Sequence, residues 1–179
     1  VTFKYGYEGA PEEKISYSNG SVEFPAFERT GHTLTGWQDA DKNPVTGQTV
    51  TITADTEFTA QWTANTIILS VTAPTFDPVT EGYSQPAAKS LTITNSGNTA
   101  ATISDVTVNN TNFIITDGET TVSANGTNST YTIQPVAGLA AGSYTATITV
   151  TYGNGATATA EVGFTVNEES TPEPEPTPD

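Results

Sequence analysis

The chain contains no cysteine. Without a thiol it can form neither a disulfide framework nor a zinc–thiolate site, and it has no cysteine nucleophile. The absence does not place the protein inside a cell, because surface proteins of many bacteria also lack disulfides. The compartment has to be inferred from other features.

Basic residues are scarce as well. Lys and Arg together number 5 against 20 Asp and Glu, which gives a net charge of −15. Binding along a nucleic-acid backbone requires a basic surface that displaces counterions, so we expect no nucleic-acid partner. An anionic membrane surface would repel such a chain.

Long apolar runs and the features of a secretion signal are also missing. No stretch approaches the roughly 20 apolar residues that span a bilayer. The chain starts at Val1, contains no Met and has no charged start followed by an apolar segment. We therefore expect an internal fragment of a longer protein, with no membrane insertion in this part.

The residues that are abundant are Thr, Ser, Asn, Gly, Val and Ile, which favour strands and turns, so the sequence predicts an all-β protein. A length of 179 residues fits one ordinary domain or two small ones. The patterns favour two, at 1–63 and 64–167, followed by 168–179. That last segment, EESTPEPEPTPD, alternates proline with acid and is predicted to be a disordered, extended linker.

The segment 64–167 alternates polar and apolar residues with a period of two, which is typical of half-buried strands. The runs 143–152 and 157–166 are predicted to form a hairpin across Gly153-Asn154-Gly155. Further strands are predicted at 67–71, 90–94 with Leu91 and Ile93 inward, 102–108, 113–116 and 129–136. About seven strands in about 100 residues favour an immunoglobulin-like β-sandwich.

The first segment, 1–63, is predicted to form strands at 1–5, 21–24, 32–37, 50–53 and 57–62. A unit of this size buries only about 60% of the surface that its unfolded chain exposes. Each large apolar side chain therefore matters to its stability. The predicted core consists of Phe3, Phe24, Leu34, Trp37, Phe58 and Trp62.

Two motifs in this segment resemble a known family. Residues 31–37 read GHTLTGW and residues 56–62 read TEFTAQW, which is similar to the internalin-type B repeat, also called the Listeria–Bacteroides repeat. His32, Leu34 and Thr59 depart from the family pattern. The resemblance implies a small β-grasp-like module, all-β or α+β, of the kind common in secreted and wall-attached proteins. Its structural signature lies at Phe3, Gly31, Leu34, Gly36, Trp37, Phe58 and Trp62.

The second segment has a resemblance of its own. Residues 80–103, TEGYSQPAAKSLTITNSGNTAATI, are similar to the opening of the Hydin-type immunoglobulin-like domains of bacterial surface proteins. The resemblance extends over about 65–167. It implies a structural or binding module with no catalytic residues.

Candidate catalytic and metal-binding residues are few. His32 is the sole histidine, and its place in a strand motif favours a packing or surface role over a Ser-His-Asp arrangement. Asp39, Asp41 and Asn43 have the spacing that opens a calcium loop. Pro44 and Val50, however, stand where an EF-hand requires Gly and Glu. We predict a polar hairpin loop there, with no catalytic residue, metal or cofactor in the chain.

Two groups of side chains have alternative interpretations. Aromatic faces suit apolar carbohydrate surfaces, but Trp37 and Trp62 are expected in the core, whereas Tyr5 and Tyr7 are harder to assign. Lys89, the sole basic residue of the second segment, could be cross-linked to Glu161. An exposed, solubilising role for Lys89 is the preferred interpretation.

The features together favour a non-catalytic, extracellular fragment of a bacterial cell-surface protein. We expect it to act as a stalk or adhesion module, attached to the cell wall or the cell surface through regions outside this chain. Two alternatives stay open. One is a recognition module for a host extracellular protein or a glycan, and the other is an accessory segment of a large secreted enzyme.

Overall fold

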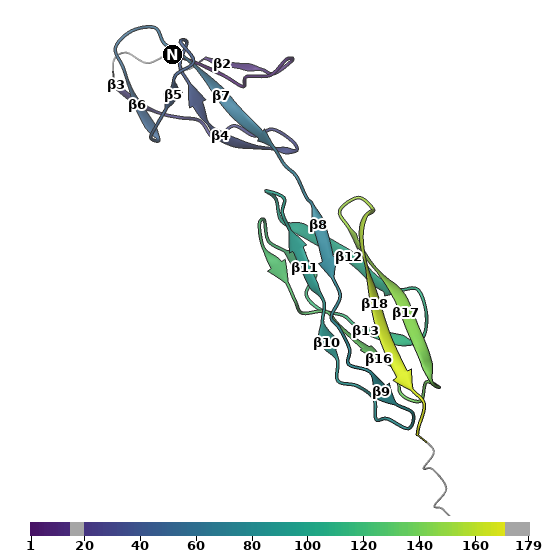
Figure 1. The fold of residues 1–179 in the computed structure, drawn as a ribbon. Helices are drawn as coiled ribbons and strands as arrows, with labels where there is room; N and C mark the ends of the chain where they lie inside the picture. The colour runs from purple at the N-terminus through teal and green to yellow at the C-terminus, as the bar shows by residue number, and fades with distance from the viewer. Residues whose placement is uncertain (15–19, 171–179) are drawn as a thin grey trace, which may run out of the picture. The chain divides into compact units, whose positions relative to one another are not determined.

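The computed structural model describes residues 1–14 and 20–170, and no helix occurs among them. The prediction of an all-β protein is confirmed. For the first module the sequence also allowed an α+β fold, but residues 1–14 and 20–65 contain no helix. The chain divides into two compact units, Val1–Asn65 (unit 1) and Thr66–Asp179 (unit 2). The division lies two residues after the predicted boundary between 63 and 64. Figure 1 shows the strands of each unit.

Unit 1 contains a five-stranded sheet with the order β2-β1-β7-β4-β5 and a separate pair, β3 and β6. The strand β1 runs parallel to β7, whereas β4 runs antiparallel to it. The bounds are β1 (Thr2–Lys4), β2 (Glu12–Lys14), β3 (Gly20–Glu23), β4 (His32–Gln38), β5 (Pro44–Val45), β6 (Thr49–Ile52) and β7 (Glu57–Ala64).

The core of unit 1 lies between the five-stranded sheet and the β3–β6 pair. Phe3, Trp37 and Phe58 are buried, and the rings of Phe3 and Trp37 meet edge to face at 5.3 Å. Phe24, Leu34 and Trp62 are only partly buried and pack against this cluster. Three of the six residues predicted for the core therefore lie at its edge. The remaining buried apolar residues are Val22, Phe27, Ile52 and Ala60.

Unit 2 contains a five-stranded sheet, β14-β12-β17-β18-β9, and two three-stranded sheets, β10-β16-β13 and β15-β11-β8. The bounds are β8 (Leu69–Thr72), β9 (Val79–Thr80), β10 (Lys89–Ser90), β11 (Thr92–Asn95), β12 (Ala101–Val108), β13 (Phe113–Thr116), β14 (Thr121–Val122), β15 (Thr127–Asn128), β16 (Thr132–Pro135), β17 (Gly142–Tyr152) and β18 (Ala156–Asn167).

The longest feature of unit 2 is the hairpin of β17 and β18. Its register runs without a break from Gly142 opposite Val166 to Tyr152 opposite Ala156. The turn is closed by the Gly155 N–H, which donates to the Tyr152 carbonyl at 3.2 Å. The predicted hairpin is therefore confirmed, with its turn at the expected residues.

The core of unit 2 is mainly aliphatic. Ile93 of β11, Ile133 of β16 and Ile148 of β17 are fully buried in one cluster, which joins side chains from all three sheets. The predicted strand 129–136 is shorter than expected because the Asn128 side chain binds the Thr130 N–H and hydroxyl, which holds those residues in a turn. The two-residue strands β9, β14 and β15 were not predicted.

Candidate functional site

The two motifs of unit 1 lie on neighbouring strands and pair with each other. Leu34 of β4 is opposite Trp62 of β7, and Trp37 is opposite Ala60, with a register shift between Leu34 and Gly36. Gly31 occupies the turn before β4 with φ of 70°, a conformation that favours glycine. The motifs thus form the central antiparallel pair of the sheet.

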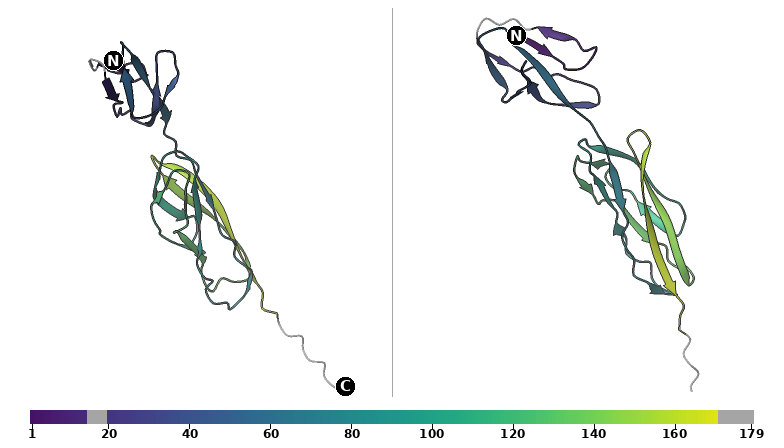
Figure 2. Two further views of the ribbon diagram at one scale, coloured as in Figure 1. Left: turned by 90° about the vertical axis from the view of Figure 1, so that its left-hand side faces the viewer. Right: turned by 45° about the horizontal axis from the view of Figure 1, so that its top comes forward.

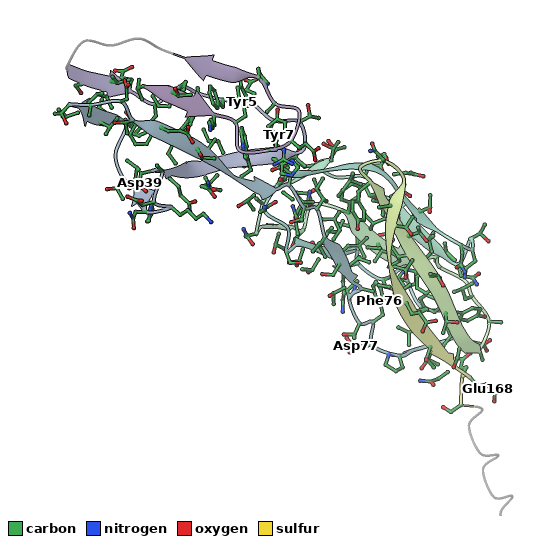
Figure 3. The ribbon with its side chains drawn as sticks, turned by 90° about the horizontal axis from the view of Figure 1, so that it is seen from above. Tyr5, Tyr7, Asp39, Phe76, Asp77 and Glu168 are labelled. Atoms are coloured by element: carbon green, nitrogen blue, oxygen red, sulfur yellow. The ribbon has the colours of Figure 1, made fainter. Side chains whose placement is uncertain are left out.

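Beside this pair lies a cluster of four aromatic rings and one guanidinium group. We call it the ring cluster, and its members are Tyr5, Tyr7, Phe27, Arg29 and Trp62. Tyr5 stacks on Phe27 with ring centroids 3.7 Å apart, and the Arg29 guanidinium lies 4.5 Å from the centre of the Tyr7 ring. The Trp62 indole N–H donates to the Tyr5 carbonyl. Figure 3 shows Tyr5 and Tyr7 as neighbours and Asp39 on a separate loop.

The contacts within the ring cluster limit what it can bind. One face of Tyr5 is covered by Phe27, and one face of Tyr7 is covered by Arg29, so neither ring offers two open faces. An open depression of about 510 Å³ lies next to the cluster, lined by Phe27, Glu28, Arg29, Thr30, His32, Leu34 and Trp62. Its lining combines apolar surface with charges of both signs.

His32 is half-buried at the edge of this depression. Its Nδ1 lies 3.1 Å from the Thr30 carbonyl. The Arg29 carbonyl also accepts the His32 backbone N–H at 3.0 Å. These bonds order the turn that leads into β4.

The loop with calcium-like spacing is a hydrogen-bonded turn between β4 and β5. The Asn43 N–H donates to Asp39 Oδ1 at 2.8 Å, and the Asn43 side-chain amide donates to Oδ2 at 3.2 Å. The hydrogen bond from the Asn43 backbone, followed by the one from its side chain, lowers the pKa of Asp39 below its usual value. The structure supports the predicted polar hairpin loop.

Acidic side chains line an open depression of about 610 Å³ beside that loop. It is bounded by Val1, Thr2, Asp39, Ala40, Asp41, Asp55, Thr56 and Glu57. Among the side chains that the structure describes, no three of His, Asp or Glu come together in a way that could hold a metal ion.

Lys89 and Glu161, the pair considered for a cross-link, lie on different sheets of unit 2. The Lys89 amine donates to the Thr75 carbonyl at 2.8 Å and lies 5.2 Å from the centre of the Phe76 ring. Glu161 is exposed on β18, opposite Thr147. Lys89 therefore fastens the segment after β8, a role that the sequence pattern did not indicate.

The turn that follows β11 holds the incoming chain of unit 2. Asn95 is fully buried, and its amide nitrogen lies 2.8 Å from the Thr99 carbonyl, while its oxygen accepts the Gly97 N–H at 2.9 Å. The Asn98 side chain accepts the Thr66 N–H at 2.7 Å. This turn is part of the motif that resembles the Hydin-type domains, but its function as an anchor was not predicted.

Two observations concern the predicted absence of membrane insertion and the scarcity of basic residues. In the part of the chain that the structure describes, no helix has the length and apolarity of a membrane span. Lys4, one of the few cations, forms an ion pair with Glu57 at 2.8 Å across β1 and β7.

No family model matches this chain, and no curated protein matches it. Among solved structures, the chain aligns with a protein of unknown function from Porphyromonas gingivalis W83. The alignment has 12% sequence identity, covers 86% of this chain and 88% of the other, and has a TM-score of 0.46. A similarity at this level supports no conclusion about function.

Proposed function

We propose that the chain is a non-catalytic stalk segment of an extracellular bacterial surface protein. In this proposal unit 1 is a module of the internalin B-repeat type and unit 2 is an immunoglobulin-like β-sandwich. Residues 168–179 continue the stalk as an acidic, proline-rich linker. The contribution of the segment is then length and spacing.

One observation carries the proposal: the chain enters and leaves unit 2 at opposite ends of the β17–β18 hairpin. At one end, Thr66 bonds to Asn98, and the hairpin turn bonds through the Gly153 N–H to Thr102. At the other end, the last strand finishes at Asn167, beyond the pair of Gly142 and Val166. Figure 2 shows this course of the chain within unit 2.

The separation of the two ends follows from the hairpin register. Ten residue steps separate the pair Tyr152–Ala156 from the pair Gly142–Val166. At roughly 3.3 Å per residue, the unit adds about 33 Å between its two ends. A module whose ends lie on the same side would add almost nothing to a stalk.

The finer assignment of unit 2 as a sandwich is supported by its core. Side chains of β11 and β16 belong to the same buried cluster as those of β12, β17 and β18, although these strands are in different sheets. Two sheets that share one core are the basis of a sandwich. For unit 1, the pairing of the two B-repeat-like motifs on β4 and β7 supports the family assignment.

A second function, recognition of a host protein or glycan, is favoured by the depression beside the ring cluster. Its lining includes exposed edges of Leu34 and Trp62 with Arg29 and Glu28 close by. Apolar surface with a few polar groups is the usual lining of a binding site.

A screen on glycan arrays and on host matrix proteins distinguishes the two functions. The stalk proposal predicts no binding by this chain beyond that of an unrelated acidic β protein. It also predicts that an unrelated module of equal length can replace 66–167 in the parent protein without loss of adhesion. Tight binding by the chain alone, abolished by Arg29→Ala, would overturn the proposal in favour of recognition.

A further inference from the structure

The first and last strands of unit 1 lie side by side and run in the same direction. Thr2 of β1 is opposite Glu57 of β7, and Lys4 is opposite Thr59. The Thr2 N–H donates to the Thr56 carbonyl at 2.9 Å. The chain therefore begins at one end of this parallel pair and leaves unit 1 at the other.

This arrangement determines how a pulling force acts on unit 1. A force applied through the two ends draws β1 backward and β7 forward, along the strand axes. The hydrogen bonds of a parallel pair are evenly spaced and slanted, and they all run from one strand to the other, so sliding of β1 along β7 loads them together. If the force were applied at the same end of both strands, the bonds would break one after another.

Buried side chains oppose the same sliding motion. Phe3 is fully buried, and its ring stacks at 5.8 Å on the ring of Phe58, the residue directly opposite. A slip of one residue would turn the side chains of β1 to the other face of the sheet and take Phe3 out of the core. The backbone ladder and the core must therefore fail together.

We propose that unit 1 is a load-bearing module, in which the β1–β7 ladder is the element that resists extension of the stalk. A spacer needs only length, whereas a module that carries force must also resist unfolding when its two ends are pulled apart. The inference depends on the stalk function for its biological use, but the resistance itself follows from the topology of unit 1.

The second unit provides an internal reference for a test. Its parallel contact between β9 and β18 has two residue pairs, Val79–Val166 and Thr80–Asn167, and involves no residue of unit 1. In the full chain both units are loaded in series. Full extension at roughly 3.6 Å per residue gives length increments of roughly 200 Å for unit 1 and 330 Å for unit 2, so the two events can be told apart.

Single-molecule pulling of the full chain, attached through cysteines, tests the proposal. The natural sequence has no cysteine, so each attachment is unique. One variant carries Val1→Cys and Glu168→Cys, which loads β1 and β7 at opposite ends. The other carries Glu8→Cys and Glu168→Cys. Glu8 is exposed and follows Tyr7, whose ring packs on Trp62, so this attachment loads both strands near the same end.

The rupture force of unit 1 is expected to fall about threefold when the attachment moves from residue 1 to residue 8, because three residue pairs share the load in one geometry only. The rupture force of unit 2 should not change. Equal forces for unit 1 in both geometries would overturn the proposal.

A second variant tests the β1–β7 ladder itself. Thr2→Pro removes the N–H that bonds to Thr56 and, with terminal attachment, should also lower the rupture force of unit 1. An unchanged force would count against the load-bearing ladder. None of these results bears on the adhesion and binding tests of the stalk function, so the two proposals fail separately.

Discussion

The two units reach a stable all-β core by different means. Unit 1 fills its interior with aromatic rings, among which Phe3 contacts Phe24, Trp37 and Phe58. Unit 2 relies on many aliphatic side chains and on a buried polar residue, Asn95, that binds surrounding backbone groups.

The difference follows from size. A small unit has few interior positions, and a Phe or Trp ring buries roughly 150 to 250 Å² at one position. A larger unit can distribute its buried area over many branched side chains and can use interior polar groups to fix its loops. Single substitutions in unit 1 should therefore be costly at rings, whereas those in unit 2 should be costly at its polar anchor.

The largest expected effect is that of Trp37→Ala. The side chain is 6% exposed and packs on Phe3 and Phe24. Its loss should cost about 3 to 5 kcal/mol, enough to unfold a unit of this size. Nuclear magnetic resonance spectra of the full chain should lose the dispersed signals of unit 1 and keep those of unit 2.

Trp37→Phe is the matched control, because it keeps a ring in the core and should leave unit 1 folded. A folded Trp37→Ala variant with an unchanged unfolding midpoint would contradict the account of the aromatic core.

In unit 2 the corresponding change is Asn95→Ala. It removes the partner of the Gly97 N–H and of the Thr99 carbonyl inside the protein. Buried backbone groups without partners should cost about 2 to 4 kcal/mol in total. Urea unfolding followed by circular dichroism measures the loss. The exposed Asn98→Ala change should cost less, and equal costs would show that burial is not the reason.

A pair of glycine substitutions sharpens the comparison within unit 2. A Cβ at Gly97 would lie 2.2 Å from the Thr66 carbonyl oxygen, whereas a Cβ at Gly163 would meet nothing closer than 3.9 Å. Gly97→Ala should destabilise unit 2 by about 1 to 3 kcal/mol because backbone must move. Gly163→Ala, on β18, should be nearly neutral. Thermal unfolding of the two variants side by side tests this difference.

The smallest expected effect is a pH dependence in unit 2. Burial, and then the charges of Asp117 and Asp105, raise the pKa of Tyr131 above its ordinary value of 10.0. The unfolded chain then loses this proton first, so unit 2 loses stability as the pH rises above about 10. The unfolding midpoint should fall less in Tyr131→Phe than in the natural protein over that range. Identical pH profiles would contradict the shift.

The sequence predicted those features that depend on local pattern. The β17–β18 hairpin follows from strict alternation on both sides of a Gly-Asn-Gly turn, and the central pair of unit 1 follows from two motifs that each read as a strand. Phe27 was missed because it lies outside any periodic segment, in a loop whose burial depends on the sheet that it covers.

Features that depend on distant partners could not be predicted. Asn95 appears in the sequence as one polar residue among many in a turn, and its function arises from carbonyls near residue 122 that the pattern does not bring to it. The ring cluster likewise joins Tyr5 and Tyr7 to residues of another loop. A pattern along one strand gives no information about such contacts.

The central claim is that the chain consists of two units that fold independently and act in series. Both tryptophans, Trp37 and Trp62, lie in unit 1, so their fluorescence reports on that unit, whereas circular dichroism reports on both. Urea unfolding of the natural protein and of Asn95→Ala, followed by both signals, is the most direct test. The account predicts that Asn95→Ala lowers the urea midpoint of unit 2, which circular dichroism detects, and leaves the fluorescence midpoint of unit 1 unchanged. A shift of the fluorescence midpoint by the same substitution would show one cooperative unit and would contradict the account.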